Sequence, residues 1–444
     1  MKAWTYWLVA GAVAAAGFPA AARAESEVDI LLNKLVEKGV LNHVDAGEIR
    51  REISATKEAR TTALAQEIVP DSARNWTWSG DLRLREEYRN RSIQSVSGAA
   101  LPNPPDANRI RIRFRYGFEA KAAETLKVGA RLATGSTTDP IATNQTFNTA
   151  FNHKAIVLDR AFAEYSPEVP GVEKLALAGG IIENPFWVAD PLVWDDDLNF
   201  DGAAVKLRKN LGETATLFTN DGLFSLQTDT SENAALWSVQ GGVILKPFAD
   251  AEDELGRHLK LTGAIAYHDY QNVTSPFSEN AAFAQAGGAG STVPAAPSSS
   301  QLKGNTAGIA DFNLLNPSVE LASQYEEVPF SLFGDFVHNT AIADSGTNGF
   351  MIGLRLGKAL IPFDPLKGWE GGYYFERLEP NATFGPFTDS DFGNGGTNHR
   401  GNVWWVRLAT LKNSALQLKY FATQELKDTK NHADTFQADW MTRF

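Results

Sequence analysis

Two groups of charged side chains stand out in this chain of 444 residues, one basic and one acidic. In the segment 109–115 every second residue is an arginine, and apolar or aromatic residues occupy the positions between. A β-strand sends alternate side chains to opposite faces, so four arginines share one face: Arg109, Arg111, Arg113 and Arg115. An arginine at the middle of a bilayer costs about 2–4 kcal/mol. This face must therefore meet water.

The acidic group falls within twelve residues of the sequence, as five aspartates: Asp190, Asp195, Asp196, Asp197 and Asp201. If their loop folds into a water-filled barrel, they face the arginines of 109–115 together with Arg83 and Arg85. Opposite charges across a narrow wet gap create a transverse field that sorts solutes by charge and dipole. The sequence thus predicts a pore constriction. Two alternatives stay open: an extracellular acidic loop, or ion pairs that only stabilise loop and wall.

The acidic segment also contains the beginning of a calcium-loop pattern. Asp197, Asn199 and Asp201 stand at alternate positions before Gly202, as in D-x-N-x-D-G. The twelfth position should be a glutamate, but it is Arg208, and a strand is expected directly after Gly202. We therefore expect no metal centre here and keep the three oxygen donors as a weak calcium candidate.

Enzymatic chemistry finds little support in the sequence. The seven histidines are scattered, and no G-x-S-x-G or H-E-x-x-H motif accompanies them. There is no cysteine, which removes thiol nucleophiles and disulfides. A formal net charge of -12 argues against a nucleic-acid partner. We expect no cofactor, and a barrel enzyme is the less favoured alternative.

The elements that position these charges alternate in polarity with a period of two from residue 76 onward. This pattern predicts sixteen strands, at about 76–85, 109–119, 124–134, 154–166, 173–183, 202–209, 212–220, 235–246, 258–269, 313–324, 328–338, 348–357, 367–379, 400–411, 413–422 and 434–444. The expected fold over 71–444 is an all-β transmembrane barrel of about 16 antiparallel strands, with 14 to 18 as the range. Barrels of 16–18 strands enclose an aqueous channel. In 154–166, either register places a charge, Asp159 or Arg160, on the outside.

The last strand carries a second signal. Phe436, Ala438, Trp440, Thr442 and Phe444 share one face, and polar residues share the other. This pattern resembles the terminal signature that the outer-membrane assembly machinery recognises, although Thr442 departs from its apolar preference. We expect Trp440 and Phe444 to be the residues that the assembly machinery recognises, and we expect outer-membrane lipid to surround the barrel.

The amino-terminal part of the sequence lacks the period-two alternation of the barrel strands. Lys2, the apolar segment 3–18 and Ala22-Arg23-Ala24 predict a signal peptide over 1–24. Segment 26–68 has a helical period of 3.6, and 25–70 is expected to form a short α-helical periplasmic segment. It is either a helical hairpin or coiled coil that pairs between subunits, or a linker helix.

Two segments carry a family resemblance: GGIIENPFWVADPLVWDDDLNFDG at 179–202 and DSDFGNGGTN at 389–398. With the helices before the barrel, the chain resembles the Gram-negative outer-membrane proteins usually called putative porins. This resemblance implies a trimeric or monomeric channel in the Gram-negative outer membrane. We expect passive diffusion of small hydrophilic solutes and ions. An anion-selective, phosphate-type channel is the alternative, since arginine ladders bind oxyanions bidentately.

Overall fold

The computed structural model describes residues 75–92, 107–148, 150–227, 233–273, 305–306, 311–343, 345–359, 368–393, 395–427 and 431–444, with nine positions between 32 and 52. The chain divides into the units Met1–Arg74 and Asn75–Phe444. The predicted signal peptide lies outside the described residues, as does most of the segment 25–70. Its described positions include a helical stretch at Lys34–Val36, but no helix there has defined bounds. The signal peptide and the coiled coil stay predictions.

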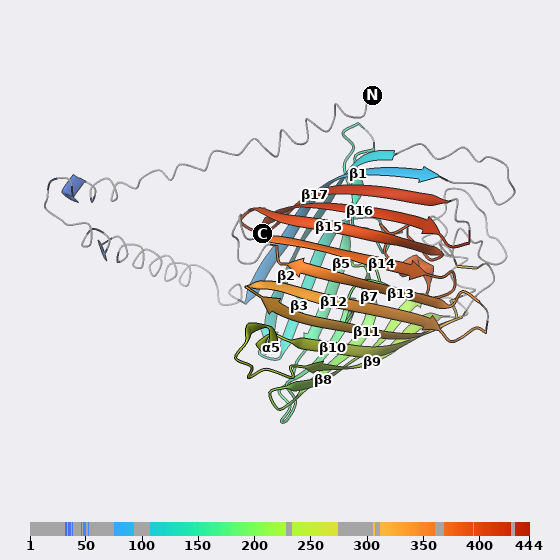
Figure 1. Cartoon of the computed structure of the whole chain (residues 1–444), viewed down its shortest axis with the longest axis horizontal. Coiled ribbons are helices and arrows are strands. Elements are labelled where there is room, and N and C mark those ends of the chain that lie inside the picture. Colours follow the sequence, from blue (N-terminus) through green and yellow to red (C-terminus); the bar gives the residue numbers. More distant parts are fainter. Residues whose placement is uncertain are drawn as a thin grey trace. The chain divides into compact units, whose positions relative to one another are not determined.

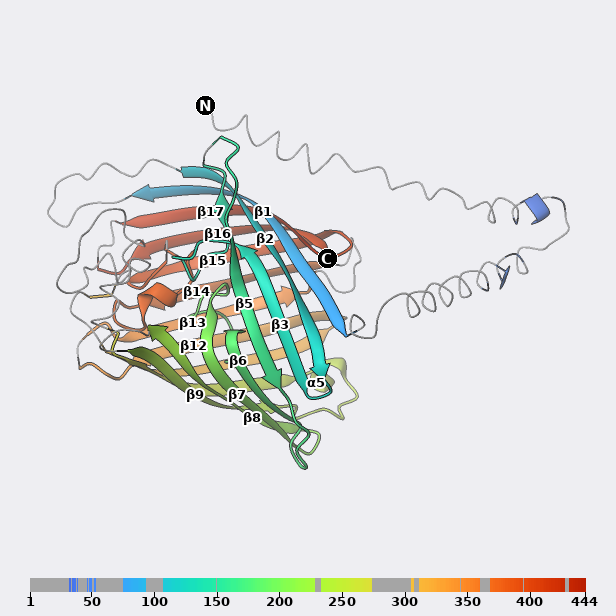
Figure 2. The same cartoon turned by 180° about the vertical axis from the view of Figure 1, so that it is seen from behind.

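The second unit is a single antiparallel sheet closed on itself (Figures 1 and 2). Its strands are β1 (Trp76–Ser92), β2 (Ala107–Ala123), β3 (Leu126–Thr134), β4 (Gln145–Thr146), β5 (Ile156–Tyr165), β6 (Lys174–Glu183), β7 (Asn199–Leu211), β8 (Ala215–Gln227), β9 (Ala234–Leu245), β10 (Lys260–Gln271), β11 (Phe312–Tyr325), β12 (Val328–Asn339), β13 (Asn348–Gly357), β14 (Trp369–Leu378), β15 (His399–Leu411), β16 (Ser414–Glu425) and β17 (His432–Arg443). In the described connections between strands there are two short helices, α5 (Glu254–Arg257) and η3 (Gly385–Phe387).

Sixteen of these strands form the wall, which confirms the predicted barrel. Neighbours in sequence pair antiparallel, β3 pairs with β5, and β17 closes the wall against β1 with Leu84 opposite Trp440. The seventeenth strand, β4, has two residues and pairs with β2 beyond the end of β3. Among the described residues no helix is long and apolar enough to cross a membrane.

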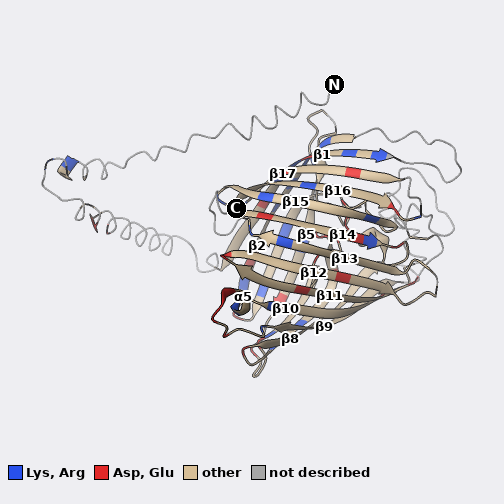
Figure 3. Ribbon diagram, in the orientation of Figure 1, with Lys and Arg blue, Asp and Glu red and all other residues tan. Residues whose placement is uncertain are grey.

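The two faces of the wall differ as the alternation predicts. In β1, Leu84 and Tyr88 are exposed on the outside, whereas Arg85 and Glu87 are buried inside. In β17 the inner face is polar and buried, and it is formed by Thr435, Gln437 and Asp439. The interior is therefore polar along these strands, and the charged positions along the wall can be followed in Figure 3.

A β-bulge resolves the register of β5. Arg131 pairs with Arg160 and the next residue, Leu132, pairs with Leu158, so that Asp159 is the extra residue. A bulge turns two neighbouring side chains toward the same side. Asp159 is buried and forms an ion pair with Arg131, and Arg160 donates to Asn199 Oδ1 at 2.7 Å. The conflict in the sequence between the two registers is thus removed by one inserted residue.

Two segments that connect strands contribute to a core inside the barrel. They are 184–198, which we call the first inner loop, and 379–398, which we call the second inner loop. Trp194 of the first and Phe387 of the second pack with Tyr270 of β10, at ring-centroid distances of 6.1 and 6.4 Å. Inward side chains of β6–β16 complete this apolar cluster. Burial of these aromatic rings supplies the energy that holds both loops inside.

Candidate channel constriction

A polar cavity of about 450 Å³ lies between the two inner loops and the wall. Its basic lining residues come mainly from the wall: Arg83, Arg85, Arg113, Arg115, Arg131, Arg160, Arg355, Arg407, Lys419 and Arg443. Its acidic lining residues come mainly from the loops: Asp190, Asp195, Asp196, Asp197, Asp389 and Asp391, with Glu183 and Glu370 on strands. The cavity therefore has a basic wall and an acidic inner side.

The first inner loop contacts the arginines of β2 through Asp197. Its Oδ1 lies 3.4 Å from Arg113 Nη1 and 3.3 Å from Arg115 Nη1, and its Oδ2 accepts from the Thr143 hydroxyl at 2.9 Å. Both arginines also pair with Asp81 of β1, at 3.0 and 2.6 Å. Burial alone would raise the pKa of Asp197, but Arg113, Arg83 and Arg115 hold this pKa below its ordinary value. Asp197 is therefore charged at neutral pH.

The same loop reaches the opposite wall through Asp190. Asp190 Oδ2 accepts from Arg355 Nη2 of β13 at 2.7 Å, and Arg355 Nη1 lies 3.4 Å from Glu320 of β11. Asp197 and Asp190 thus anchor the loop at two sides of the barrel. Asp196, between them in sequence, is exposed to the cavity.

Asp195 joins the two inner loops. Its Oδ1 accepts from the Asp197 N–H at 2.7 Å, its Oδ2 accepts from the Ser390 N–H at 2.7 Å, and its own N–H donates to the Phe387 carbonyl at 2.8 Å. Burial, together with the negative charges of Asp389 and Asp197, raises the pKa of Asp195 well above its ordinary value. Asp195 therefore holds the two inner loops together through hydrogen bonds.

The basic residues of β1 face the second inner loop. Arg85 holds Asp439 of β17 through two nitrogens, at 2.7 and 2.9 Å, and donates to Asp391 at 2.7 Å. Burial raises the pKa of Asp391, but the Arg85 guanidinium overcomes this effect and holds the pKa far below its usual range. Arg83 donates to Asn144 Oδ1 at 2.7 Å and has no carboxylate partner among the described residues.

The other two arginines of the ladder lie outside this cavity. Arg109 Nη2 is 2.6 Å from Glu87 Oε1, and Arg111 Nη1 is 3.7 Å from Glu87 Oε2. Glu87 is completely buried and also forms an ion pair with Arg89, with 2.8 Å between Arg89 Nε and Glu87 Oε1. The four arginines of 109–115 therefore form two groups. Arg109 and Arg111 form ion pairs near the start of β2, and Arg113 and Arg115 line the cavity.

Asp201 requires a correction. The sequence predicts that it lies inside the barrel with the other aspartates, but it is exposed and lies on the face of β7 opposite the buried Phe200 and Ala204. The first inner loop ends before β7, so the period-two alternation of the strand already applies to Asp201.

The calcium candidate fails for a related reason. Asp197 binds arginines, Asn199 binds Arg160 and Asp159, and Asp201 points away; the described residues contain no metal-binding cluster.

Several residues that line the cavity were not predicted from the sequence. Asp389 and Asp391 precede a glycine-rich stretch, and both line the cavity. Burial raises the pKa of Asp389 to about 6, with Lys419 opposing and Asp391 and Asp196 adding to the increase. Alternation along β15 and β16 would have placed Arg407 and Lys419 inside. The contact of Arg85 with Asp391 spans 306 residues and leaves no signal in the local sequence.

The two predicted assembly residues lie at the seam of the barrel. Trp440 is on the outer face of β17, between Leu84 of β1 and Leu416 of β16. Phe444 is 56% exposed, and its backbone N–H and carbonyl exchange hydrogen bonds with Gly80 at 3.0 and 2.7 Å. Its ring stacks on Phe114 and Tyr116, each at 6.3 Å. The carboxyl terminus therefore completes both the hydrogen-bond ladder and an aromatic belt.

Comparison with known families decides the class. The family model described as "Putative porin" matches residues 93–341 and 308–444. This chain belongs to that family. Among curated proteins none matches.

Solved structures are also similar to this chain, and one of them reaches a TM-score of 0.50. The high-pH structure of OprB from Pseudomonas putida is 9% identical, with a TM-score of 0.50 over 83% of this chain and 94% of that chain. The channel DcaP of Acinetobacter baumannii is 12% identical with a TM-score of 0.43, over 83% and 97% of the two chains. The OmpF complex with daunomycin from Salmonella typhi is 10% identical with a TM-score of 0.46, over 83% and 97%. The protein is a porin-like channel of the outer membrane and not an enzyme.

Proposed function

We propose that this porin allows passive diffusion of small hydrophilic solutes and ions, and that the charged cavity is its constriction. The main support is the placement of acidic loops against a basic wall across one wet cavity of about 450 Å³. Charges on opposite sides of such a gap orient dipolar solutes and favour one sign of ion. The expected passage is a weakly selective one.

The charges that act on solutes are those without a counter-ion. Asp197, Arg113, Arg115 and Arg85 are engaged in ion pairs, which fix the inner loops more than they attract solutes. Arg83 and Asp196 line the same cavity, and neither has an ion-pair partner among the residues that the structure describes. Three further charged residues line the cavity without an ion-pair partner among the described residues: Asp389, Lys419 and Arg443. We infer that these five side chains contribute most to the transverse field.

An anion-selective channel is the alternative proposal. The arginine ladder favours it, but its arginines already have carboxylate partners in Glu87, Asp81 and Asp197. A ladder that binds solute oxyanions needs free guanidinium groups. The pairing therefore favours the weakly selective channel.

Reversal potentials in planar bilayers under a salt gradient test both proposals. Arg83→Gln should shift selectivity toward cations and Asp196→Asn toward anions, because each removes one charge from one side of the field. The shifts should be larger at 0.01 M salt, where the Debye length is about 30 Å, than at 1 M, where it is about 3 Å. Lys412→Gln in the turn between β15 and β16 is the control, with no shift expected. Strong anion selectivity of the unaltered protein would favour the alternative. Unchanged potentials in both folded variants would show that this cavity is not on the permeation path.

We also propose that the channel assembles as a homotrimer. Asp221 lies at the centre of β8 on the outer face, which it shares with the exposed Leu217 and Leu223. Its neighbours across the sheet are Val205 and Val239. A carboxylate is unfavourable against lipid, and a second subunit would offer it a polar surrounding. This position supports a subunit contact at β7–β9.

A further inference from the structure

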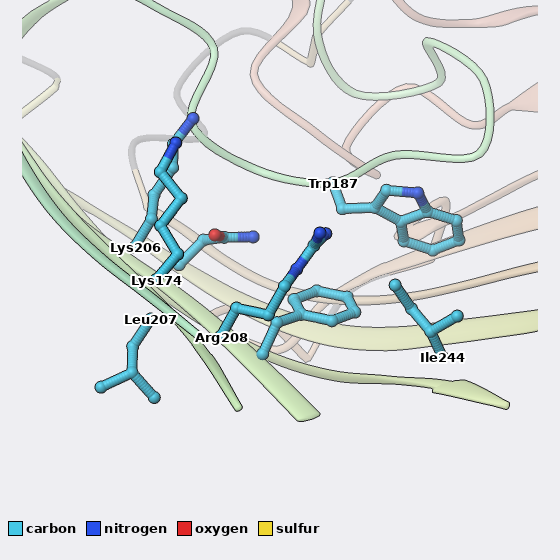
Figure 4. A pocket seen from close by; sticks show the side chains of 8 residues that line it. Lys174, Trp187, Lys206, Leu207, Arg208 and Ile244 are labelled. Carbon is cyan, nitrogen blue, oxygen red and sulfur yellow. The ribbon is translucent and has the colours of Figure 1, made fainter. Parts of the chain in front are cut away.

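A second pocket, of about 200 Å³, lies on the inner wall of β6–β9 and shares no lining residue with the constriction. It is near the end of the barrel that carries short turns, such as the one at Gly212 between β7 and β8. In outer-membrane barrels short turns face the periplasm. Figure 4 shows Lys174 and Lys206 on one side of the pocket, Trp187 with Ile244 on the other, and Arg208 between them. Lys174 comes from β6, and Lys206 and Arg208 come from β7.

The basic side of the pocket lacks matching carboxylates. Lys174 is opposite Arg208 in the register, and Ala176 is opposite Lys206, so the three side chains emerge close together. Lys174 Nζ lies 4.0 Å from Glu164 Oε1. Neither Lys206 nor Arg208 has an ion-pair partner within the described part of the chain. Two clustered positive charges without a counter-ion, next to a third that pairs with Glu164, attract anions. An arginine can also bind a carboxylate with two parallel hydrogen bonds.

The other side of the pocket is apolar and firmly held. Trp187 and Phe218 pack edge to face with ring centroids 6.4 Å apart. The backbone of Trp187 is fixed by Gln240, which accepts from its N–H at 2.8 Å and donates to its carbonyl at 2.7 Å. Gln240 is held in turn by the Asn220 amide at 2.8 Å. The indole therefore has a fixed position against the wall, and a planar apolar group of a ligand can pack there.

We propose that this pocket binds small aromatic carboxylates at the periplasmic side of the channel. The carboxylate would lie between Lys206 and Arg208, with Lys174 nearby, and the ring would pack against Trp187 and Phe218. The volume is below the about 300–1,000 Å³ typical of sites for drug-sized ligands, which fits one small ring-bearing acid. Solute passage in this proposal rests on the proposed channel function, but the binding step can be measured without conduction.

Isothermal titration calorimetry of the full, detergent-solubilised chain tests the binding with benzoate as probe. Acetate has the charge without the ring, benzamide has the ring without the charge, and inorganic phosphate is a simple anion. Benzoate should bind more tightly than all three. The double variant Lys206→Gln, Arg208→Gln should weaken benzoate binding about tenfold or more, because two charge-assisted contacts are lost. Trp187→Leu keeps its backbone contacts and should weaken benzoate but not phosphate. Lys412→Gln is the control, with unchanged binding expected.

Three results would overturn the proposal: equal affinity for benzoate and acetate, phosphate binding as tightly as benzoate, or unchanged benzoate affinity in the folded double variant. Heat-modifiable migration on gels establishes that each variant is folded. Conductance in planar bilayers separates this inference from the proposed function. A chain that conducts without binding benzoate contradicts only the pocket. A chain that binds benzoate without conducting contradicts only the channel.

Discussion

At the scale of single residues, the arginines inside this barrel are organised by their counter-ions. Arg113 and Arg115 each lie between Asp81 on the neighbouring strand and Asp197 on the first inner loop. The wall supplies one carboxylate and the loop supplies the second. Asp197 thus has two roles, since it neutralises the wall and anchors the loop to it.

Replacement of Asp197 by Asn should affect both roles. We expect selectivity to shift toward anions, because Arg113 and Arg115 lose one negative neighbour. Stability should fall by about 1–3 kcal/mol, because buried hydrogen-bonding groups lose their charged partner. Reversal potentials and the temperature of the heat-modifiable gel shift measure the two effects. Asp201→Asn is the matched control, because Asp201 is exposed outside the cavity. Equal behaviour of the two variants would contradict the role of Asp197.

The second residue-scale prediction concerns pH. Asp389 has a pKa of about 6, raised by burial, so it is neutral below that pH and charged above it. Anion preference should therefore decrease as the pH rises from 5 to 7. Stability should also fall as the pH rises from about 4 to 6, because the folded state retains a proton that the unfolded state has lost.

Reversal potentials and thermal unfolding at several pH values check both trends. Asp389→Asn should remove the selectivity change near pH 6, whereas Asp201→Asn should keep it. A selectivity change that persists in folded Asp389→Asn would assign it to another group.

At the scale of elements, the strands were predictable and the inner loops were not. All sixteen wall strands follow from alternation, because a wet lumen and an apolar exterior impose a period of two. The bulge at Asp159 could not be located from the sequence, since either register turned one charge outward. The inward fold of 379–398 depends on Asp391 meeting Arg85 and on Phe387 packing with Trp194, and such distant contacts leave no periodicity.

The closing strand provides the element-scale prediction. Removal of 434–444 leaves β1 and β16 with unpaired edges, so we expect no assembled, heat-modifiable barrel. Phe444→Ala should reduce the assembled yield less severely, because the backbone contacts with Gly80 remain. Phe248→Ala is the matched control, since Phe248 is also 56% exposed but lies between β9 and β10. Normal assembly without the last strand would contradict the closure of the wall by β17.

At the scale of the whole molecule, the interior is divided into two regions. Aromatic side chains of the inner loops belong to an apolar cluster with inward residues of β6–β16, and the charged cavity is lined by residues of β1–β3, β5, β6 and β13–β17. The basic pocket of Lys206 and Arg208 lies near the turn end of β6–β9. A solute would therefore meet a balanced set of charges in the cavity and an unbalanced basic set near the turns.

The outer surface carries the last prediction, which concerns assembly. Asp221 stands at the centre of β8 among outward apolar side chains. If β7–β9 contact a second subunit, Asp221→Leu should remove a polar contact and weaken the trimer, and each chain should remain a folded barrel. If Asp221 faces lipid, the same change should leave the mass of the assembly unchanged and stabilise the barrel, because leucine is more stable in the bilayer than a carboxylate.

Light scattering after size-exclusion chromatography in detergent measures the mass of the assembly. Glu86→Leu, which also replaces an exposed outward carboxylate, on β1, should leave the mass unchanged. A single-chain mass for the unaltered protein, or an unchanged trimer in Asp221→Leu, would contradict this interface.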